Sequence, residues 1–146
     1  MPGFSVHIVS ATRSNEADFW LHSLLGCSLK QPQHSDLLAR ICFDNSKPLP
    51  LHYNASIDAV DEGILIFCHD DVDLGADSLI PSLEAALERF DIVGVAGNQR
   101  SWPGQSSWWL MPNGIDFDYP FLSGAISHGL PESAELDVFA PCQRLF

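Results

Sequence analysis

A short run of acidic residues follows the most apolar stretch of the chain, and it includes one histidine. Its members are His69, Asp70, Asp71 and Asp73. Closely spaced carboxylates at the end of a buried strand repel one another, which costs stability unless a cation, hydrogen-bond donors or water compensates. Carboxylate oxygens suit Mg²⁺ or Mn²⁺, which keep open positions for substrate phosphates, and a histidine nitrogen favours Mn²⁺. The run predicts a divalent-cation site, although any single aspartate taken alone is better explained as a solvated turn residue.

Apolar strand patterns alternate with helical ones over the first two thirds of the chain, which indicates an α/β fold with a mostly parallel sheet. The expected strands are residues 4–11, 37–43, 64–68 and 92–96. The expected helices follow a cap at Ser14 or Asn15, span residues 51–60 with Gly63 as a stop, and follow a cap at Asp77 or Ser78. Because residues 64–68 are the most strongly apolar, we expect them to form a central strand buried on both faces.

Three polar clusters follow the first three expected strands, at residues 12–15, 44–46 and 69–73. Ligands of open parallel sheets bind outside the carboxyl ends of the strands, where helix N-termini point their N–H groups outward. We therefore expect the three clusters to share one rim.

The alternation stops after residue 97. Residues 98–114 are rich in Gly, Pro, Ser and Trp and predict a long loop, and residues 117–127 and 136–140 predict short strands, antiparallel at the sheet edge. The loop contains Trp102, Trp108 and Trp109, whose faces can stack on sugar rings. Cover for the sheet edge or a contact between subunits is the slightly better explanation for at least two of the three.

The net charge of the chain bears on which partners it can bind. The chain has 146 residues, of which 46% are hydrophobic, and a net charge of −12. This charge disfavours direct contact with nucleic acid or with an anionic membrane surface. No membrane span and no basic signal region is present, so we expect a cytoplasmic protein without membrane insertion. The four cysteines, Cys27, Cys42, Cys68 and Cys142, form no CxxC pair and are expected to be reduced.

Residues 53–59 (YNASIDA) and 62–72 (EGILIFCHDDV) form one block. This block resembles the inverting GT-A glycosyltransferases of family 2, in the branch written approximately YNxxIxxAxGxxLxFxHDDV. Further matches are residues 93–97, 127–129 and 136–140, the last similar to an LDGxFxA strand, so that the resemblance extends from Val6 to about Arg144. It implies a GT-A fold, a Rossmann-like three-layer sandwich. Residues 1–97 would be the nucleotide and metal half of a single domain, and residues 98–146 part of the acceptor half.

The resemblance also implies site residues. The metal-binding DxD element falls on His69, Asp70 and Asp71, with His69 in place of the first aspartate and Asp71 contacting the metal held by the nucleotide. Asp73 is a further metal candidate. The implied nucleotide contacts are Thr12, Arg13, Asp44, Asn54 and Asp70. A surface charge is an equally good explanation of Arg13, and a structural role is an equally good one of Asn54.

The implied activity is metal-dependent transfer of a sugar, with inversion, from a nucleoside-diphosphate sugar to a saccharide, lipid or protein acceptor. The base in such enzymes follows a segment like residues 136–145, and the local carboxylates here are Glu135 and Asp137. Asp137 is carried forward as the candidate, at the LDG position of the pattern. The chain is expected to be truncated before the usual acidic segment, and a homo-oligomer is one way to complete it.

Two other hypotheses remain open at this point. One is a GT-A-like nucleotide-binding or assembly module without catalysis, which the histidine at position 69 favours. The other is an unrelated Mg²⁺-dependent phosphotransfer domain. Such domains often carry an acidic nucleophile after the first strand, where this chain has Thr12 and Arg13.

Overall fold

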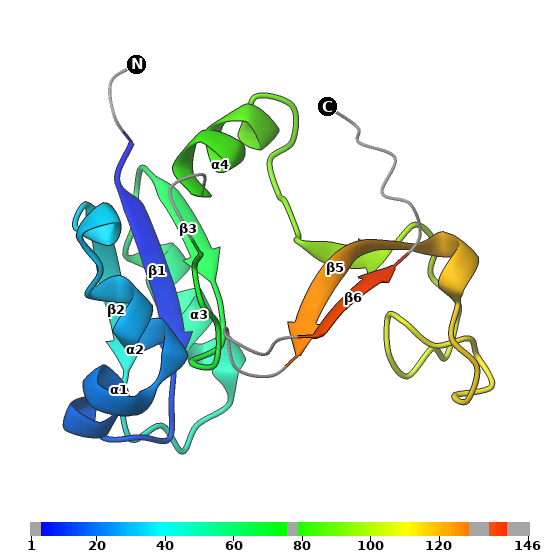
Figure 1. Cartoon of the computed structure of the whole chain (residues 1–146), viewed down its shortest axis with the longest axis horizontal. Coiled ribbons are helices and arrows are strands. Elements are labelled where there is room, and N and C mark those ends of the chain that lie inside the picture. The colour runs from blue at the N-terminus through cyan, green and yellow to red at the C-terminus, as the bar shows by residue number, and fades with distance from the viewer. Residues whose placement is uncertain (1–3, 76–78, 129–134, 140–146) are drawn as a thin grey trace. The chain divides into compact units, whose positions relative to one another are not determined.

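The computed structural model describes residues 4–75, 79–128 and 135–139 (Figure 1). The chain divides into two compact units, Met1–Ser82 and Leu83–Phe146. This boundary lies earlier in the chain than the division after residue 97 that was expected from the sequence. Both units contain a β-sheet, parallel in the first and antiparallel in the second.

The first unit is built on three parallel strands in the order β2-β1-β3. They are β1 (Val6–Ala11), β2 (Leu37–Cys42) and β3 (Ile64–Phe67). Val6 pairs with Leu37 on one side and with Ile64 on the other, so the three strands run in register. The expected α/β class is confirmed here, and so are the first three strands to within two residues at each end.

The helices of the chain begin near the predicted caps. They are α1 (Glu16–His22), α2 (Leu24–Leu29), α3 (Leu49–Asp58) and α4 (Leu79–Leu87), with short 3-10 turns at η1 (Pro32–His34) and η2 (Tyr119–Phe121). Asn15 caps α1, because its side chain accepts a hydrogen bond from the backbone N–H of Asp18. The predicted stop at Gly63 is wrong, since α3 ends at Asp58 and Gly63 directly precedes β3.

The helix expected after Asn15 is divided into α1 and α2 at Ser23. Ser23 has extended backbone angles, and its hydroxyl accepts a hydrogen bond of 2.8 Å from the N–H of Gly26. A Cβ atom at Gly26 would lie 2.3 Å from the carbonyl oxygen of Phe19. The junction therefore requires glycine, and the apolar helical spacing across it did not indicate the break.

The sheet of the first unit is covered on both faces. Ile8 of β1 forms a buried core with Phe19 of α1 and Leu25 of α2. Side chains alternate between the faces of a strand, so the next residues point away from that core. On the opposite face, the ring of Tyr53 in α3 lies 4.8 Å from the ring of Phe67 in β3. The first unit is therefore a helix–sheet–helix sandwich, seen in Figure 1.

Strand β3 does not take the predicted central place. In the described sheet β1 is central and β3 is at an edge, with Phe67 39% exposed. The apolar run correctly predicted a strand next to the core. It did not specify the hydrogen-bonding neighbours, because a buried edge strand and a central strand have the same hydrophobic pattern.

The expected fourth parallel strand at residues 92–96 is also wrong. Ile92 and Val95 are each 90% exposed, and the strand that forms here, β4 (Ala96–Asn98), begins where the prediction ended. Its hydrogen bonds go to β5, since Ala96 pairs antiparallel with Gly124. Short apolar runs predict a strand but not its partner.

The second unit contains the antiparallel sheet β4-β5-β6. Strands β5 (Leu122–His128) and β6 (Glu135–Phe139) match the two short strands expected near the C-terminus. They form a separate sheet with β4, rather than the edge of the parallel sheet. Caps predicted at Asp77 and Ser78 lie outside the described residues.

A buried ion pair holds the long loop of the second unit. Asp118 is 1% exposed, and both of its carboxylate oxygens accept hydrogen bonds from the Arg100 guanidinium. The amide of Asn98 donates to the same carboxylate and to the carbonyl of Trp108. The Arg100 guanidinium also lies 3.5 Å from the ring centroid of Phe121. The predicted loop is confirmed, but this anchor was missed because its members are up to twenty positions apart.

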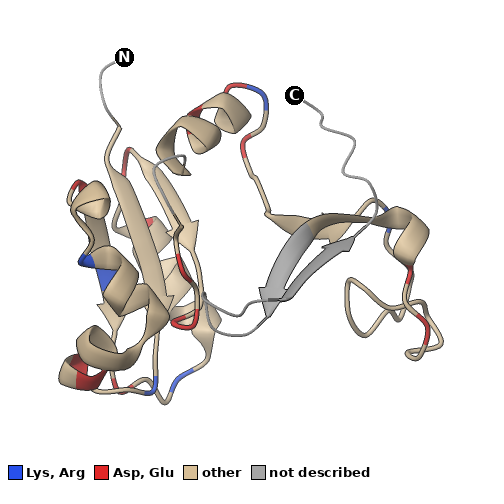
Figure 2. Cartoon of the chain, viewed as in Figure 1, with Lys and Arg blue, Asp and Glu red and all other residues tan. Residues whose placement is uncertain are grey.

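Acidic positions are spread over both units, and basic positions are few (Figure 2). Among the described residues, no helix combines the length and the apolarity needed to cross a membrane.

The Asp118 ion pair makes the stability of the second unit sensitive to acid. Hydrogen bonding from Arg100, supported by Asn98, lowers the Asp118 pKa from 3.8 to about 2. The lowered pKa stabilises the fold fully above pH 3.8, and this contribution is lost as the pH falls through about 2. We expect the stability difference between wild type and Asp118→Asn to shrink across this window, measured by urea unfolding.

The exposed Asp91 provides the control. The Asp91→Asn variant should follow the wild-type curve over the same pH range. A difference between wild type and Asp118→Asn that stays constant with pH would contradict the role of the ion pair.

Candidate functional site

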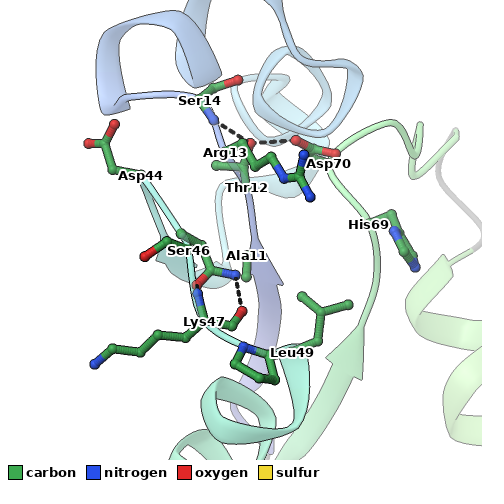
Figure 3. A pocket seen from close by; sticks show the side chains of 12 residues that line it. Ala11, Thr12, Arg13, Ser14, Asp44, Ser46, Lys47, Leu49, His69 and Asp70 are labelled. Carbon is green, nitrogen blue, oxygen red and sulfur yellow. Dashed lines mark hydrogen bonds between the residues drawn. The ribbon is translucent and has the colours of Figure 1, made fainter.

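The three polar clusters predicted to share a rim do so in the structure. They line one open cleft of about 900 Å³ at the carboxyl ends of β1, β2 and β3. The lining residues fall into three segments, 11–14, 44–49 and 69–70 (Figure 3). Because parallel strands end on the same side of a sheet, residues far apart in sequence meet there.

The loops after β1 and β2 are joined by backbone hydrogen bonds. The N–H of Thr12 donates to the carbonyl of Cys42 at 2.9 Å, and the N–H of Asn45 donates to the carbonyl of Thr12 at 2.8 Å. The N–H of Asp44 donates to the carbonyl of Ser14 at 3.0 Å. Asp44 has a φ of +49°, a left-handed conformation that aspartate tolerates better than most residues. The two loops thus form one fixed wall with the Asp44 side chain exposed.

Thr12 connects the first loop to the third. Its side chain is buried, and its hydroxyl donates to the Asp70 carboxylate while accepting a hydrogen bond from the N–H of Ser14 at 3.1 Å. The donor capacity of the hydroxyl is therefore used within the protein. Thr12 was expected to contact a nucleotide, and in the structure its hydroxyl holds Asp70.

Two cationic side chains line the cleft. Arg13 is exposed, and Figure 3 shows its guanidinium on the side of the cleft where His69 and Asp70 lie. Lys47 lines the cleft from the loop after β2, with its ammonium directed outward. Neither side chain forms an ion pair with another residue of the described part of the chain. Lys47 was not predicted as a site residue, because the polar cluster identified in the sequence ends at residue 46.

Several predicted site residues lie outside the cleft. Asp71 is exposed beside it, and Asn54 is exposed on α3 without lining it. One oxygen of Asp73 accepts hydrogen bonds from the Ser28 hydroxyl at 3.2 Å and from the N–H of Gly75 at 2.9 Å. Asp73 thus closes a turn against α2. Asp137 lies in β6, where it pairs with Ile126, and its side chain is outside the described residues.

The residues at the cleft suit a cation that also takes ligands from a bound molecule better than a cation held by protein side chains only. Within the described ranges, no three or more His, Cys, Asp and Glu side chains are grouped to hold a metal ion. His69 and Asp70 line the cleft, and Asp71 follows them. Mg²⁺ usually binds through one or two carboxylates together with substrate phosphates and water. These residues match that mode and not a closed protein cage.

The amide of Asn45 links the cleft to α3. Its Nδ2 donates to the carbonyl of Lys47, and its Oδ1 accepts from the N–H of Lys47 at 2.8 Å. His52 of α3 lies 2.9 Å from the same Oδ1, and 3.3 Å from the sulfur of Cys42. Since Oδ1 only accepts, the His52 Nε2 carries the proton. This network fixes the Lys47 loop, and no sequence spacing indicated it.

The described cysteines are free thiols, as expected. They are Cys27, Cys42 and Cys68, and Cys142 lies outside the described residues. Burial raises the pKa of Cys68 to about 11, so this thiol stays protonated at neutral pH. It packs in the core of the first unit and takes no part in the cleft.

No protein-family model matches this chain, and neither does a curated protein or a solved structure. What the cleft binds is therefore inferred from its own residues and geometry.

Thr12 supplies a direct test of how the cleft is held together. The Thr12→Val variant removes the hydroxyl but keeps the shape, which leaves the Asp70 carboxylate without its donor. A lost hydrogen bond to a charged group costs about 1.5–3 kcal/mol. We expect Thr12→Val to lower the free energy of unfolding by about that amount, measured by urea denaturation.

Thr12→Ser retains the hydroxyl and should preserve most of the stability. In an Asp70→Asn background, the effect of Thr12→Val should become smaller, because the two residues are coupled. Equal costs in both backgrounds would show that Thr12 acts independently of Asp70.

Proposed function

We propose that this chain is a GT-A-type glycosyltransferase domain. It binds a nucleoside-diphosphate sugar in the cleft together with Mn²⁺ or Mg²⁺, and it transfers the sugar to an acceptor with inversion. One observation carries the proposal: the loops after β1, β2 and β3 converge on a single cleft that contains two cationic side chains and the His69–Asp70 pair. This is where open parallel sheets bind nucleotides.

The size and charge of the cleft agree with such a ligand. Its volume of about 900 Å³ lies within the range of roughly 300–1,000 Å³ typical of ligand sites. The chain has a net charge of −12, so a diphosphate needs local positive charge to bind. Arg13 supplies a guanidinium suited to phosphate oxygens, and Lys47 adds a second positive charge from the loop after β2.

The remaining groups divide between the base and the cation. The exposed carboxylate of Asp44 is placed to accept hydrogen bonds from N–H groups of a nucleotide base. The cation would take one or two protein ligands from among His69, Asp70 and Asp71, and diphosphate oxygens and water would complete its coordination. A bound divalent cation offsets the charge that develops on the leaving diphosphate.

The proposed reaction is a direct displacement. An acceptor hydroxyl oxygen attacks the anomeric carbon from the face opposite the diphosphate, and the bond from that carbon to the phosphate oxygen breaks. The leaving nucleoside diphosphate keeps the electron pair, and Arg13 stabilises its charge. A carboxylate takes the hydroxyl proton. Asp137 is the candidate because it is one of the two carboxylates of this segment, with Glu135, although the family pattern places it at the LDG position and not at that of the usual base.

A nucleotide-binding module without catalysis is the second candidate. Asp73 is held by Ser28 and Gly75, and one oxygen of Asp70 is held by Thr12. His69 stands where the family pattern has an aspartate. This reduced donor set favours binding over turnover.

Nucleotide binding tests both candidates. In calorimetric titrations with a panel of nucleoside diphosphates, Mn²⁺ should raise the affinity of the wild-type chain, and Asp71→Ala should abolish this increase. Arg13→Gln should weaken binding about tenfold, the loss of about 1.4 kcal/mol expected for one charge-assisted contact. Lys30→Gln is the matched control, because Lys30 is exposed on the first unit but does not line the cleft.

A folded wild-type sample that binds no nucleoside diphosphate, with or without metal, would refute the proposal. Where binding occurs, incubation with sugar nucleotides separates the two candidates. Release of nucleoside diphosphate supports the glycosyltransferase, and metal-dependent binding without release supports the module.

A further inference from the structure

The second unit carries a pair of stacked aromatic rings on its surface. The ring centroids of Phe117 and Tyr119 are 5.1 Å apart, with an angle of 16° between the ring planes. Phe117 is 44% exposed and Tyr119 is 58% exposed. Each ring covers part of its neighbour, so the pair holds two large apolar side chains in one orientation.

The ion pair between Asp118 and Arg100 holds the backbone that carries the two rings. Asp118 lies between the two aromatic residues in sequence, and its side chain is directed inward to Arg100. Its N–H donates to the carbonyl of Trp109 at 2.9 Å, and Phe117 forms an isolated β-bridge with Leu110. The backbone carrying the rings is therefore anchored on both sides. A ligand that stacks on them pays little ordering entropy.

Two fixed polar side chains precede the rings in the chain. The turn just before Phe117 presents Asn113 and Asp116, whose side chains hydrogen-bond each other at 2.7 Å. The Oδ1 atom of Asn113 accepts from the N–H groups of Ile115 and Asp116. These contacts fix the amide and the carboxylate, both solvent-exposed, in the turn that leads into Phe117. An apolar surface that continues into a turn with fixed hydrogen-bonding groups matches a ligand that is itself apolar on one face and polar at its edge.

The exposed area of the rings and the net charge of the chain indicate which ligand of that kind fits best. The exposed surface of the two rings is on the order of 200 Å², given side-chain areas of about 150–250 Å², and the 77% exposed Ile115 of the same turn adds to this apolar surface. A stable protein interface buries about 800 Å² on each partner. The net charge of −12 disfavours an anionic ligand. A neutral sugar ring has the matching size, since its axial C–H groups form an apolar face and its hydroxyls lie at the edge.

We propose that Phe117 and Tyr119 form a carbohydrate-binding platform. The C–H face of a neutral pyranose stacks on an exposed ring face, where the negative face of the ring attracts the C–H hydrogens. Asn113 and Asp116 accept and donate hydrogen bonds to the hydroxyls. This binding needs neither nucleotide nor metal, so it can be tested independently of the function proposed for the cleft.

Saturation-transfer NMR on the full chain tests the platform, with neutral tetrasaccharides of glucose, xylose and N-acetylglucosamine and no nucleotide or metal. We expect saturation of the sugar C–H protons for at least one of them. Phe117→Leu and Tyr119→Leu keep an apolar side chain but remove the ring face, and each should weaken binding at least fivefold. Ile115→Ala, which removes an exposed apolar residue of the same loop, should change it less than twofold.

Three results would overturn the proposal. They are no binding of any tetrasaccharide, binding that survives both leucine substitutions, and concentration-dependent dimerisation that the same substitutions abolish. The last would make the pair a protein interface. Thermal unfolding of each variant checks the fold, and the more exposed Tyr119 decides the outcome where Phe117→Leu does not fold.

Discussion

Strand β1 hydrogen-bonds to β2 on one side and to β3 on the other, and both pairings are parallel. Everything that lines the cleft depends on this arrangement. Because the three strands end at the same edge, the segments that follow them meet although they are at least twenty positions apart in sequence. Ile8 at the middle of β1 also forms the core with α1 and α2, so the strand that aligns the cleft is also the best buried.

A small number of hydrogen bonds converts that alignment into a fixed site. Thr12 is the residue where they meet, since its backbone joins the first loop to the second and its hydroxyl joins the first loop to Asp70. The buried Thr12 therefore holds the loops of the cleft together, where a contact with the ligand had been expected from the sequence. The side chains left exposed on the wall, Arg13 and Asp44, are those available to a ligand.

The second unit is organised by a different interaction. Its long loop has little regular structure, and the buried pair of Asp118 and Arg100 replaces an apolar core as the element that determines its path. Burying the Asp118 carboxylate is tolerated because both of its oxygens are hydrogen-bonded by the partly exposed Arg100 guanidinium, which lies over the ring of Phe121. The same pair turns neighbouring aromatic residues outward, which is why large apolar side chains stand exposed there in a fixed arrangement.

The sequence by itself determined the three parallel strands, the start of the first helix and the edge of the sheet where the polar residues gather. Strand periodicity, the Asn15 cap and the polar residues at strand ends are local signals, readable over a few positions. The tertiary structure decided which strand is central, that Ala96–Asn98 joins a separate sheet, that Asp73 closes a turn, and that Asp118 is buried. Each of these depends on a partner distant in sequence, and a hydrophobic pattern specifies how deeply a residue is buried but not which residue it will contact.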